Sequence, residues 1–510
     1  MCNDHFLMGL HDHLRASARS VAALYIPFDR SAGIPYYHQI YQGLRGAILD
    51  GRLVRGQRLP STRSLASELG ISRLPVLTAY DQLFHEGYLV GRIGAGTYVA
   101  PSVPSRQERA STGPVAAMRS QLPQARQAHA GIRTDRAQSL GPFRVGLPAL
   151  DQFPQKAWSR LVSRHARQLP AELMAYGGPR GHLPLRAAVA AYLRAARDVR
   201  CEPSQVLMVG GSQMALQLCA AVLLRANDVA CVENPGYPGA WKALAATGGT
   251  IRGVPLDGAG LVVRALERRR RARLVYVTPS HQYPLGMAMA ASRRLELLEW
   301  ARRNDAWIVE DDYDSEYRFA SRPLGALQGM DGAGRVIYIG TFSKVLFPAL
   351  RLGYLVVPQP LLARFLDARD ALDLFSPTLY QSALTDFIAQ GHFARHVRRM
   401  RSTYQNRRDA LVGAIHRTLG HRLEIVNADA GMHLSTWFQP GIDDLAVVRR
   451  AADRGLYPIA LSTCFVDSDA RSGLVLGFGG STKAQIDRAV DALSRINDDV
   501  VDGRPARASR

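Results

Sequence analysis

Short apolar runs alternate with helical periods from about residue 140 onward, and this alternation limits the possible folds more than any other feature. The clearest runs lie at residues 206–209, 229–232, 274–277, 307–309 and 336–339. Strands that are apolar on both faces and separated by amphipathic helices are typical of a mainly parallel sheet with helices on both sides. The pattern therefore predicts a large α/β domain.

The end of the chain has a different pattern. Helices are predicted at residues 381–390 and 393–419, and alternating apolar residues predict a strand at residues 433–438. Helices mixed with such strands indicate a smaller α+β domain. We expect the large domain to span residues 140–379 and the small domain residues 380–500, followed by a tail at residues 501–510.

A compact helical pattern occupies residues 35–100. Apolar residues at helical spacing, among them Tyr37, predict a first helix with one buried face. Ser61 or Thr62 is suited to cap a second helix, and Gly70 is suited to end it.

A third helix is predicted from residue 73 to 85, with Ser72 as its cap and Leu77 among its inward side chains. A glycine-rich hairpin over residues 86–99 follows it. Three short helices and a hairpin predict a winged helix-turn-helix, whose third helix enters the major groove of DNA. The side chains expected to contact DNA are Arg63, Ser72, Arg73, Arg92 and Thr97.

The remaining segments, residues 1–34 and 101–139, lack such patterns. Residues 1–34 form a lead-in, and residues 101–139 have the composition of a linker, rich in Ser, Pro, Gln, Ala and Arg. The arginines of the linker leave two interpretations open. A solvated tether is favoured, and contact with DNA phosphates is the alternative.

The composition restricts the environment and the partners. A net charge of +21 favours a polyanionic partner, although the arginines are scattered. The five cysteines form no CxxC pair, which indicates free thiols in a reducing compartment and neither a disulfide framework nor a metal site. No apolar run approaches the roughly 20 residues of a membrane helix, and the N-terminus is a poor signal peptide. We expect a cytoplasmic protein that does not bind membranes.

Lys344 is one of only four lysines among 64 basic residues. It ends the run Thr341 to Lys344, directly after the predicted strand at 336–340, and Arg351 follows seven residues later. An amine forms an imine with an aldehyde, whereas a guanidinium does not. The motif suits a lysine that holds an aldehyde cofactor as a Schiff base, and an ordinary loop lysine is the alternative.

Other strand ends supply the remaining parts of a pyridoxal phosphate site. Gly211, Ser212 and Gln213 join a strand to a helix whose free N–H groups are suited to hold a phosphate. Asp311 and Tyr313 lie two residues apart, so they share one face of a strand. A carboxylate beside the pyridine nitrogen keeps that nitrogen protonated, and a phenol can bond the ring hydroxyl.

Two aromatic residues complete this set. Tyr237 is suited to stack on the cofactor ring, and His281 to meet the ring hydroxyl. Taken singly, each is more simply a structural residue. The full series along the chain, from the phosphate turn to Lys344 and Arg351, is improbable by chance.

The segments LPSTRSLASELGISR, AYDQLFHEGYL and GAGTYV resemble the winged helix of the GntR type. This family commonly has polar residues where this chain has Leu74 and Pro75, so we expect a different base preference.

Residues 140–500 resemble a fold type I aminotransferase. The resemblance implies that Lys344 is the Schiff-base lysine, that Asp311 pairs with the pyridine nitrogen, and that Tyr237 stacks on the ring. It implies that Tyr313 bonds the ring oxygen and that Tyr176 reaches across a homodimer interface. It also implies a phosphate site formed by Gly211, Ser212, Gln213, Thr341 and Arg351.

A winged helix joined to such a domain is similar to the MocR (GabR-like) branch of the GntR regulators, whose usual strings are close to TPSHQYPLG and EDDYDSEYRF. The resemblance implies a bacterial transcription factor that senses a small-molecule effector through bound pyridoxal phosphate. It implies a homodimer on double-stranded DNA with repeated half-sites.

Val475 stands where aminotransferases usually carry the arginine that binds the substrate carboxylate, and Arg471 is expected to point elsewhere. Because valine cannot bind a carboxylate, we expect a regulator with at most a residual transaminase half-reaction. Its effector would be pyridoxal phosphate itself, which implies vitamin B6 metabolism, or an amino compound. The alternative is an active aminotransferase with a fused DNA-binding domain, because Lys344, Asp311 and Tyr313 are all present.

Overall fold

The computed structural model describes residues 26–86, 88–92, 96–101, 140–267, 272–319, 325–466 and 470–502. The chain divides into two compact units, residues 1–128 and residues 129–510. Each unit is described by itself below. Among the described residues, no helix is both long enough and apolar enough to cross a membrane.

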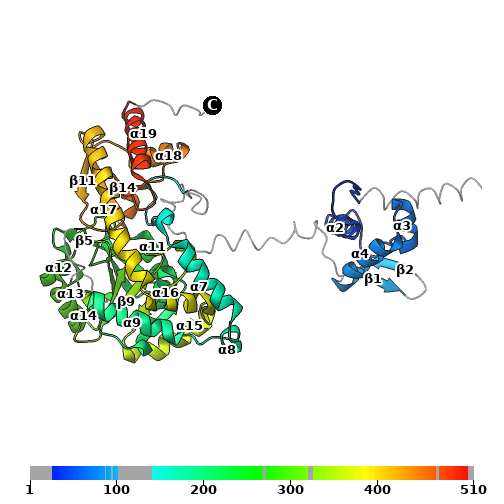
Figure 1. The fold of residues 1–510 in the computed structure, drawn as a ribbon, viewed down its shortest axis with the longest axis horizontal. Helices are drawn as coiled ribbons and strands as arrows, with labels where there is room; N and C mark the ends of the chain where they lie inside the picture. Colours follow the sequence, from blue (N-terminus) through cyan, green and yellow to red (C-terminus); the bar gives the residue numbers. More distant parts are fainter. Residues whose placement is uncertain are drawn as a thin grey trace, which may run out of the picture. The chain divides into compact units, whose positions relative to one another are not determined.

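The first unit has the three helices and the hairpin that the sequence predicts. Its elements are α2 (Tyr36–Leu49), α3 (Thr62–Leu69), α4 (Arg73–His85), β1 (Leu89–Arg92) and β2 (Gly96–Val99) (Figure 1). The Ser61 hydroxyl caps α3 by accepting a hydrogen bond from the Ser64 N–H at 3.1 Å. Gly70 ends α3 in the left-handed conformation, with φ of 66°.

Two inward side chains of this unit were predicted wrongly. Tyr37 is 39% exposed and Leu77 is 37% exposed. On α4 the buried face is formed by Val76, Ala79 and Tyr80. Leu77 lies one residue, or about 100° of helix rotation, beyond Val76 and therefore points away from the core.

The second unit contains an eight-stranded sheet with the order β3-β10-β9-β8-β7-β4-β5-β6. Four of its pairings are parallel, which confirms the predicted α/β class. β6 and β10 are antiparallel to their neighbours and were not predicted. The strands are β3 (Val206–Val209), β4 (Val229–Asn234), β5 (Thr250–Asp257), β6 (Gly260–Leu261), β7 (Ala272–Val277), β8 (Trp307–Asp312), β9 (Val336–Thr341) and β10 (Gly353–Val356).

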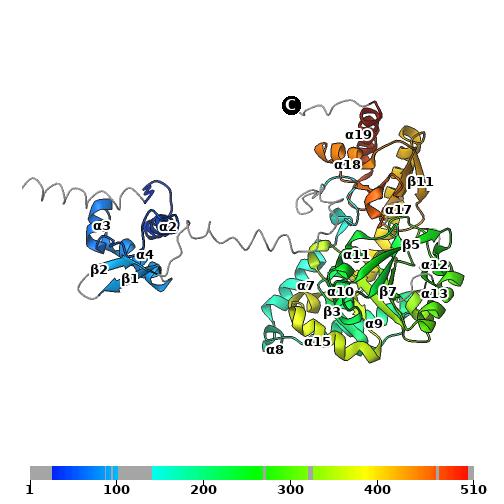
Figure 2. The same cartoon turned by 180° about the vertical axis from the view of Figure 1, so that it is seen from behind.

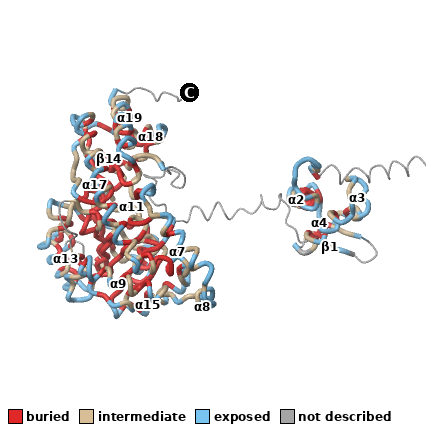
Figure 3. Tube along the Cα trace, viewed as in Figure 1, coloured by how far each residue is buried: buried red, intermediate tan, exposed pale blue. Residues whose placement is uncertain are grey.

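Helices cover both faces of this sheet (Figure 2), and the most buried parts of the trace lie in its strands and the adjoining helices (Figure 3). Buried side chains of the strands alternate between two cores, one on each face. One face packs against α10 (Ser212–Leu223), α11 (Pro238–Ala245) and α15 (Leu362–Asp373). The other face packs against α7 (Gln155–Arg167), α9 (Leu183–Arg197), α12 (Val263–Glu267), α13 (Ala291–Arg303), α14 (Leu327–Met330) and α16 (Thr378–Ala389). The short helix α8 (Ala171–Met174) follows α7.

The second unit also contains a separate four-stranded antiparallel sheet. Its order is β11-β12-β14-β13, with β11 (Leu423–Asn427), β12 (His433–Phe438), β13 (Ile459–Ala460) and β14 (Gly473–Gly477). It shares one core with α17 (His392–Thr418), α18 (Asp444–Asp453) and α19 (Lys483–Val501). Phe143 belongs to this core and pairs with Gly477 on β14, so the start of the unit packs against its end.

Candidate functional site

Six strands of the large sheet end at the same edge. β4, β5, β7, β8 and β9 are mutually parallel, and β10 is antiparallel to both β9 and β3, so β3 points the same way as these five. Ligands of α/β sheets bind at the carboxyl ends of the strands. The residues that the sequence analysis singled out follow these ends.

Asp311 lies at the end of β8 and is 4% exposed. The Tyr276 hydroxyl on β7 donates a hydrogen bond to Asp311 Oδ2 at 2.8 Å. Burial raises the pKa of Asp311 to about 7, although the Tyr276 hydrogen bond and the positive charge of Lys344 both lower it.

The second oxygen of this carboxylate, Asp311 Oδ1, is buried and has no hydrogen-bond partner among the described residues. A buried polar atom without a partner costs about 1–3 kcal/mol. A ligand that brings a positively charged N–H group to this oxygen would remove that cost and stabilise the ionised carboxylate.

Lys344 follows β9 and is half-buried. Its ammonium donates a hydrogen bond to the Gly146 carbonyl at 3.1 Å. A Cβ atom at Gly146 would lie only 2.4 Å from Lys344 Nζ, and Gly146 itself has φ of 76°. The backbone at residue 146 can therefore approach the amine this closely only because no side chain is present.

Gly211 forms the turn between β3 and α10 and has φ of 101°. A Cβ atom there would lie 3.4 Å from Arg351 Nη1, so the Arg351 guanidinium lies beside the N-terminus of α10. Strand pairing sets Thr341 opposite Gly353, and Gly353 opposite Val209. This corner thus joins a guanidinium, a hydroxyl and the free N–H groups of a helix start, which together suit a phosphate.

Gln213 and Tyr237 meet directly. Gln213 Nε2 donates to the Tyr237 hydroxyl at 3.1 Å, which joins the first turn of α10 to the residue before α11. The Tyr237 ring packs edge-on against Tyr283 with ring centroids 5.4 Å apart. Ser212 is the first residue of α10, and this position alone assigns it to the corner.

His281 lies between a phenol and a carboxylate. Its Nδ1 atom is 2.8 Å from Asp314 Oδ1 and 3.0 Å from the Tyr313 hydroxyl. A ring nitrogen cannot donate its proton to the carboxylate and also accept one from the phenol. If Nδ1 donates to Asp314, the Tyr313 proton remains free for another acceptor.

His433 on β12 packs against this group, with its ring 5.1 Å from that of His281. Its Nε2 atom lies 3.2 Å from the Pro284 carbonyl, and burial lowers its pKa to about 3. Among the described residues, His281, Asp314 and His433 are the one group whose ligand atoms have metal-like spacing. Their hydrogen bonds account for this proximity without an ion.

The position at which the sequence analysis expects no carboxylate-binding arginine is apolar. Val475 is fully buried on β14 in a cluster with Tyr283 and Leu461. Arg471 lies over the Trp437 ring at 4.5 Å from its centroid and pairs with Glu424 at 3.5 Å. The guanidinium of Arg471 is thus engaged away from Val475.

Tyr176 is 87% exposed and contacts the Phe375 ring edge-on at 6.3 Å. Among the described residues of a single chain, Tyr176 makes no hydrogen bond or ring contact with the residues above.

Three residues of the pocket were missed by the sequence interpretation. Tyr276 was predicted only as part of the buried strand at 274–277, although it shares a sheet face with Asp311 through the parallel pairing of β7 with β8. Asp314 lies within the EDDYDSEYRF string but was not singled out, and the carbonyl of Gly146 comes from a segment without a motif. Strand parity would have found Tyr276, but no local signal identifies Gly146.

In the first unit, the starts of α3 and α4 meet. Arg73 Nε donates to Thr62 Oγ1 at 2.9 Å, and Arg63, Ser72 and Arg73 are all exposed. Leu74, next on α4, is 70% exposed. Ser72, Arg73 and Leu74 form the exposed start of the predicted recognition helix α4, and Arg63 lies at the start of α3.

The hairpin carries the other predicted DNA contacts. Thr97 on β2 is half-buried and pairs with Gly91. The Arg92 side chain and the tip at residues 93–95 lie outside the described residues. A Cβ atom at Gly96 would lie 3.1 Å from Arg58 Nε, so Arg58, which was not predicted, lies beside the start of β2.

Family comparisons agree with both units. The family of bacterial regulatory proteins of the gntR type matches residues 36–99, and the aminotransferase class I and II family matches residues 149–493. The structure of LysN, an α-aminoadipate aminotransferase from Thermus thermophilus, superimposes with a TM-score of 0.67 at 28% identity. That match covers 71% of this chain and 93% of LysN. The chain thus joins a gntR-type DNA-binding domain to an aminotransferase-like domain.

Curated relatives have the same two-part organisation. The chain is 41% identical to the probable rhizopine catabolism regulatory protein MocR of Rhizobium meliloti, over 91% of this chain and 94% of MocR. It is 35% identical to the pyridoxine biosynthesis regulator PdxR of Corynebacterium glutamicum, over 86% of this chain and 91% of PdxR. The chain therefore belongs to the MocR-type transcriptional regulators of the gntR family.

Proposed function

We propose that this regulator binds pyridoxal 5'-phosphate in the pocket at the strand ends and uses it to couple a small-molecule signal to DNA binding. The observation that carries the proposal is the buried, unpartnered Oδ1 of Asp311, which lies in the same pocket as the Lys344 amine. A protonated pyridine nitrogen supplies the N–H group that this oxygen lacks. The cofactor and the DNA partner place the protein in the bacterial cytoplasm.

Each residue of the pocket has a role in holding this cofactor. Lys344 offers the amine, Asp311 and Tyr276 hold the ring nitrogen, and Tyr237 stacks on the ring. The phosphate is held by Gly211, Ser212, Gln213, Thr341 and Arg351. When bound, pyridoxal phosphate supplies an aldehyde that condenses with amines and a ring that withdraws electrons.

His281 acts on the cofactor through Tyr313. In this proposal Asp314 accepts the Nδ1 proton of His281, 2.8 Å away, so Nδ1 cannot also accept the Tyr313 proton. The Tyr313 hydroxyl then remains free to donate to the oxygen on the cofactor ring. This assigns to His281 a positioning role in place of the direct contact with the ring hydroxyl.

The apolar surroundings of Val475 limit the class of effector that the protein can bind. An amino acid bound for transamination needs a cationic partner for its carboxylate. The buried Val475 offers none, and Arg471 is held by Trp437 and Glu424. We therefore propose that pyridoxal phosphate itself is the effector and that the protein regulates vitamin B6 synthesis or salvage, as the name of its relative PdxR suggests. A small amino compound without this carboxylate requirement is the alternative effector.

The regulator acts as a homodimer in this proposal. The exposed Tyr176 reaches the pocket of the second copy, and two winged helices read repeated half-sites on double-stranded DNA. Arg63, Ser72, Arg73, Arg92 and Thr97 contact that DNA. The effector changes the relative stability of two arrangements of the dimer, and this difference alters the affinity for DNA.

A transaminase assay separates the regulator from an active aminotransferase, which Lys344, Asp311 and Tyr313 would permit. We expect common amino acids to convert the bound cofactor to its amine form slowly, because none of them can be fixed at Val475. The measurement is the absorption of the loaded protein during titration, together with keto acid release. Rapid conversion by any common amino acid would establish the enzyme and reject the regulator with only residual activity.

Leu74 gives a prediction for base recognition. An exposed leucine at the start of a recognition helix suits the 5-methyl group of thymine. We expect Leu74→Ala to weaken binding to an operator selected from a random library by about 5-fold, or ~1 kcal/mol. Replacing the contacted thymine by deoxyuridine should cause the same loss in the wild type and none in Leu74→Ala. Equal losses in both proteins would show that Leu74 does not contact this methyl group.

A further inference from the structure

Two neighbouring helices of the aminotransferase-like unit carry an unusual excess of positive charge. α7 has Lys156, Arg160, Arg164 and Arg167 and no acidic residue. The first 17 residues of α17, up to Arg408, contain six arginines and no acidic residue. A solvent-exposed helix usually alternates charges of both signs, which gives favourable pairs along its surface.

Contacts place the N-terminal part of α17 beside the segment that leads into α7. Arg399 of α17 donates to the Gln152 carbonyl just before α7, and the Phe153 ring packs edge-on against His396 at 5.9 Å. Burial lowers the pKa of His392, and the positive charges of Arg395 and Arg160 lower it further. Arg160 of α7 therefore lies close to the N-terminus of α17.

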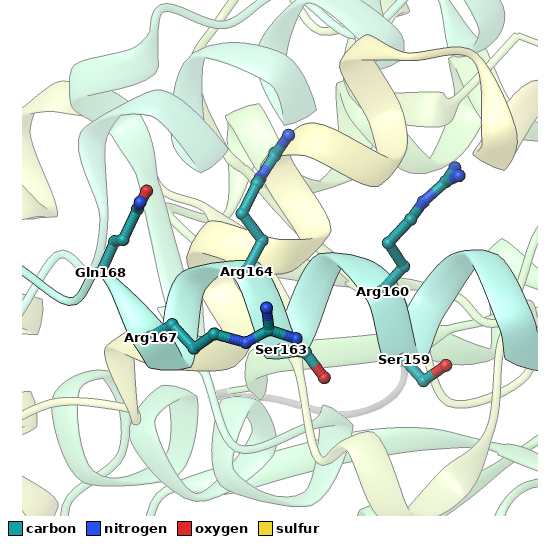
Figure 4. A pocket seen from close by; sticks show the side chains of 6 residues that line it. All are labelled: Ser159, Arg160, Ser163, Arg164, Arg167 and Gln168. Atoms are coloured by element: carbon teal, nitrogen blue, oxygen red, sulfur yellow. The ribbon is translucent and has the colours of Figure 1, made fainter.

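We define the arginine patch as Lys156, Arg160, Arg164 and Arg167 of α7 with Arg395 and Arg399 of α17, all of which are exposed. Figure 4 shows Arg160 and Arg164 extending side by side from α7, with Ser159 and Ser163 on the adjacent part of the helix. These residues, together with Arg167 and Gln168, line one surface pocket.

The charges of the patch are poorly compensated within the described residues. Asp386 pairs with both Arg164 and His165, and Asp151 is engaged by Arg407. Arg395 donates to the Gln390 carbonyl, a neutral group, at 2.9 Å. No ion pair with an acidic side chain is found for Lys156, Arg160, Arg167, Arg395 or Arg399 in the described parts of the chain.

We infer that the arginine patch is a second DNA-binding surface, which contacts backbone phosphates without reading bases. One guanidinium group can donate two parallel hydrogen bonds to the oxygens of a phosphate. Hydroxyl and amide side chains beside it can donate further hydrogen bonds to the same oxygens. Double-stranded DNA is the polyanion that the first unit is proposed to bind. Once the first unit holds DNA, the local concentration of that DNA is raised for any other basic surface of the same protein.

The inference rests on the proposed DNA partner and adds a second contact to it. It implies that the aminotransferase-like unit contributes to affinity directly, and that salt weakens binding more steeply than the winged helices alone would require. Each phosphate contact contributes about −0.9 to the slope of log affinity against log salt concentration.

The test compares three full-length proteins on a long random-sequence duplex over a series of salt concentrations. The patch variant carries Arg160→Gln, Arg167→Gln and Arg395→Gln. The control variant carries Arg302→Gln, Arg417→Gln and Arg449→Gln, which removes the same charge from exposed arginines that have acidic partners. We expect the patch variant to lose about 2–3 from the magnitude of the salt slope, and the control variant to match the wild type.

Three other outcomes would overturn the inference. If the patch variant keeps the wild-type slope, or if both variants change equally, the patch makes no specific phosphate contacts. If sedimentation shows that the patch variant changes its oligomeric state, the surface is an interface between copies of the chain. A winged-helix variant with Arg63→Ala and Arg73→Ala tests the DNA partner separately. If this variant binds a selected operator as tightly as the wild type, the proposed DNA contacts of the winged helix are rejected.

Discussion

Replacing Lys344 by alanine is expected to abolish the visible absorption of the protein mixed with pyridoxal phosphate. The amine of Lys344 lies close enough to Asp311 for its charge to lower the pKa of that carboxyl, and no other lysine lies within three residues of the end of a strand of the large sheet. The wild type should show a band near ~420 nm that the variant lacks. The variant should still bind DNA, because the winged helix belongs to a separate unit. Its DNA affinity should no longer respond to added pyridoxal phosphate.

Lys242→Ala is the matched control for this experiment. Lys242 lies on α11 and is exposed, so its loss should leave the band and the DNA response unchanged. If Lys344→Ala keeps the full band while Lys242→Ala loses it, the amine has been assigned wrongly. If the wild type itself shows no band, the pocket does not bind the cofactor and only the DNA-binding function is supported.

The sequence predicted the fold well where the signal was periodic. The strands at 206–209 and 433–438 were placed with the bounds that the structure has, and α4 begins and ends at the predicted residues. β10 was missed as an antiparallel strand because its apolar run has no feature that distinguishes its direction. Direction is decided by the pairing of β10 with both β9 and β3, which is a long-range property.

Only part of the pocket was accessible from sequence. Motifs at strand ends singled out Lys344 and Asp311 as candidates, but not the Tyr276 hydroxyl that donates to the Asp311 carboxylate. Tyr276 is separated from Asp311 by 35 residues, and only the parallel pairing of their strands brings them together. His281 was expected to touch the ring hydroxyl, and its contacts with Asp314 and Tyr313 could not be inferred without the fold.

Asp311→Asn is expected to change cofactor affinity and protein stability in opposite directions. A pKa of about 7 in the folded state, against 3.8 ordinarily, means that the folded protein retains a proton which the unfolded chain loses between these pH values. The stability of the cofactor-free wild type therefore falls as pH rises from about 4 to about 7, by at most about 4 kcal/mol for this group. Asparagine removes this loss, so the cofactor-free variant should resist urea at least as well as the wild type above pH ~7.

The same substitution removes the negative charge that pairs with the protonated ring nitrogen. We expect the affinity for pyridoxal phosphate to fall by about 100-fold or more, or ~3 kcal/mol, as for the loss of one partner of a buried ion pair. Tyr276→Phe should cause a smaller loss, about 5-fold, because it removes one hydrogen bond and leaves the charge. Absorption titrations and urea unfolding of the same preparations measure both effects. Unchanged cofactor affinity in a folded Asp311→Asn variant would show that this carboxylate does not hold the ring, whereas joint loss of stability and affinity would indicate a structural role.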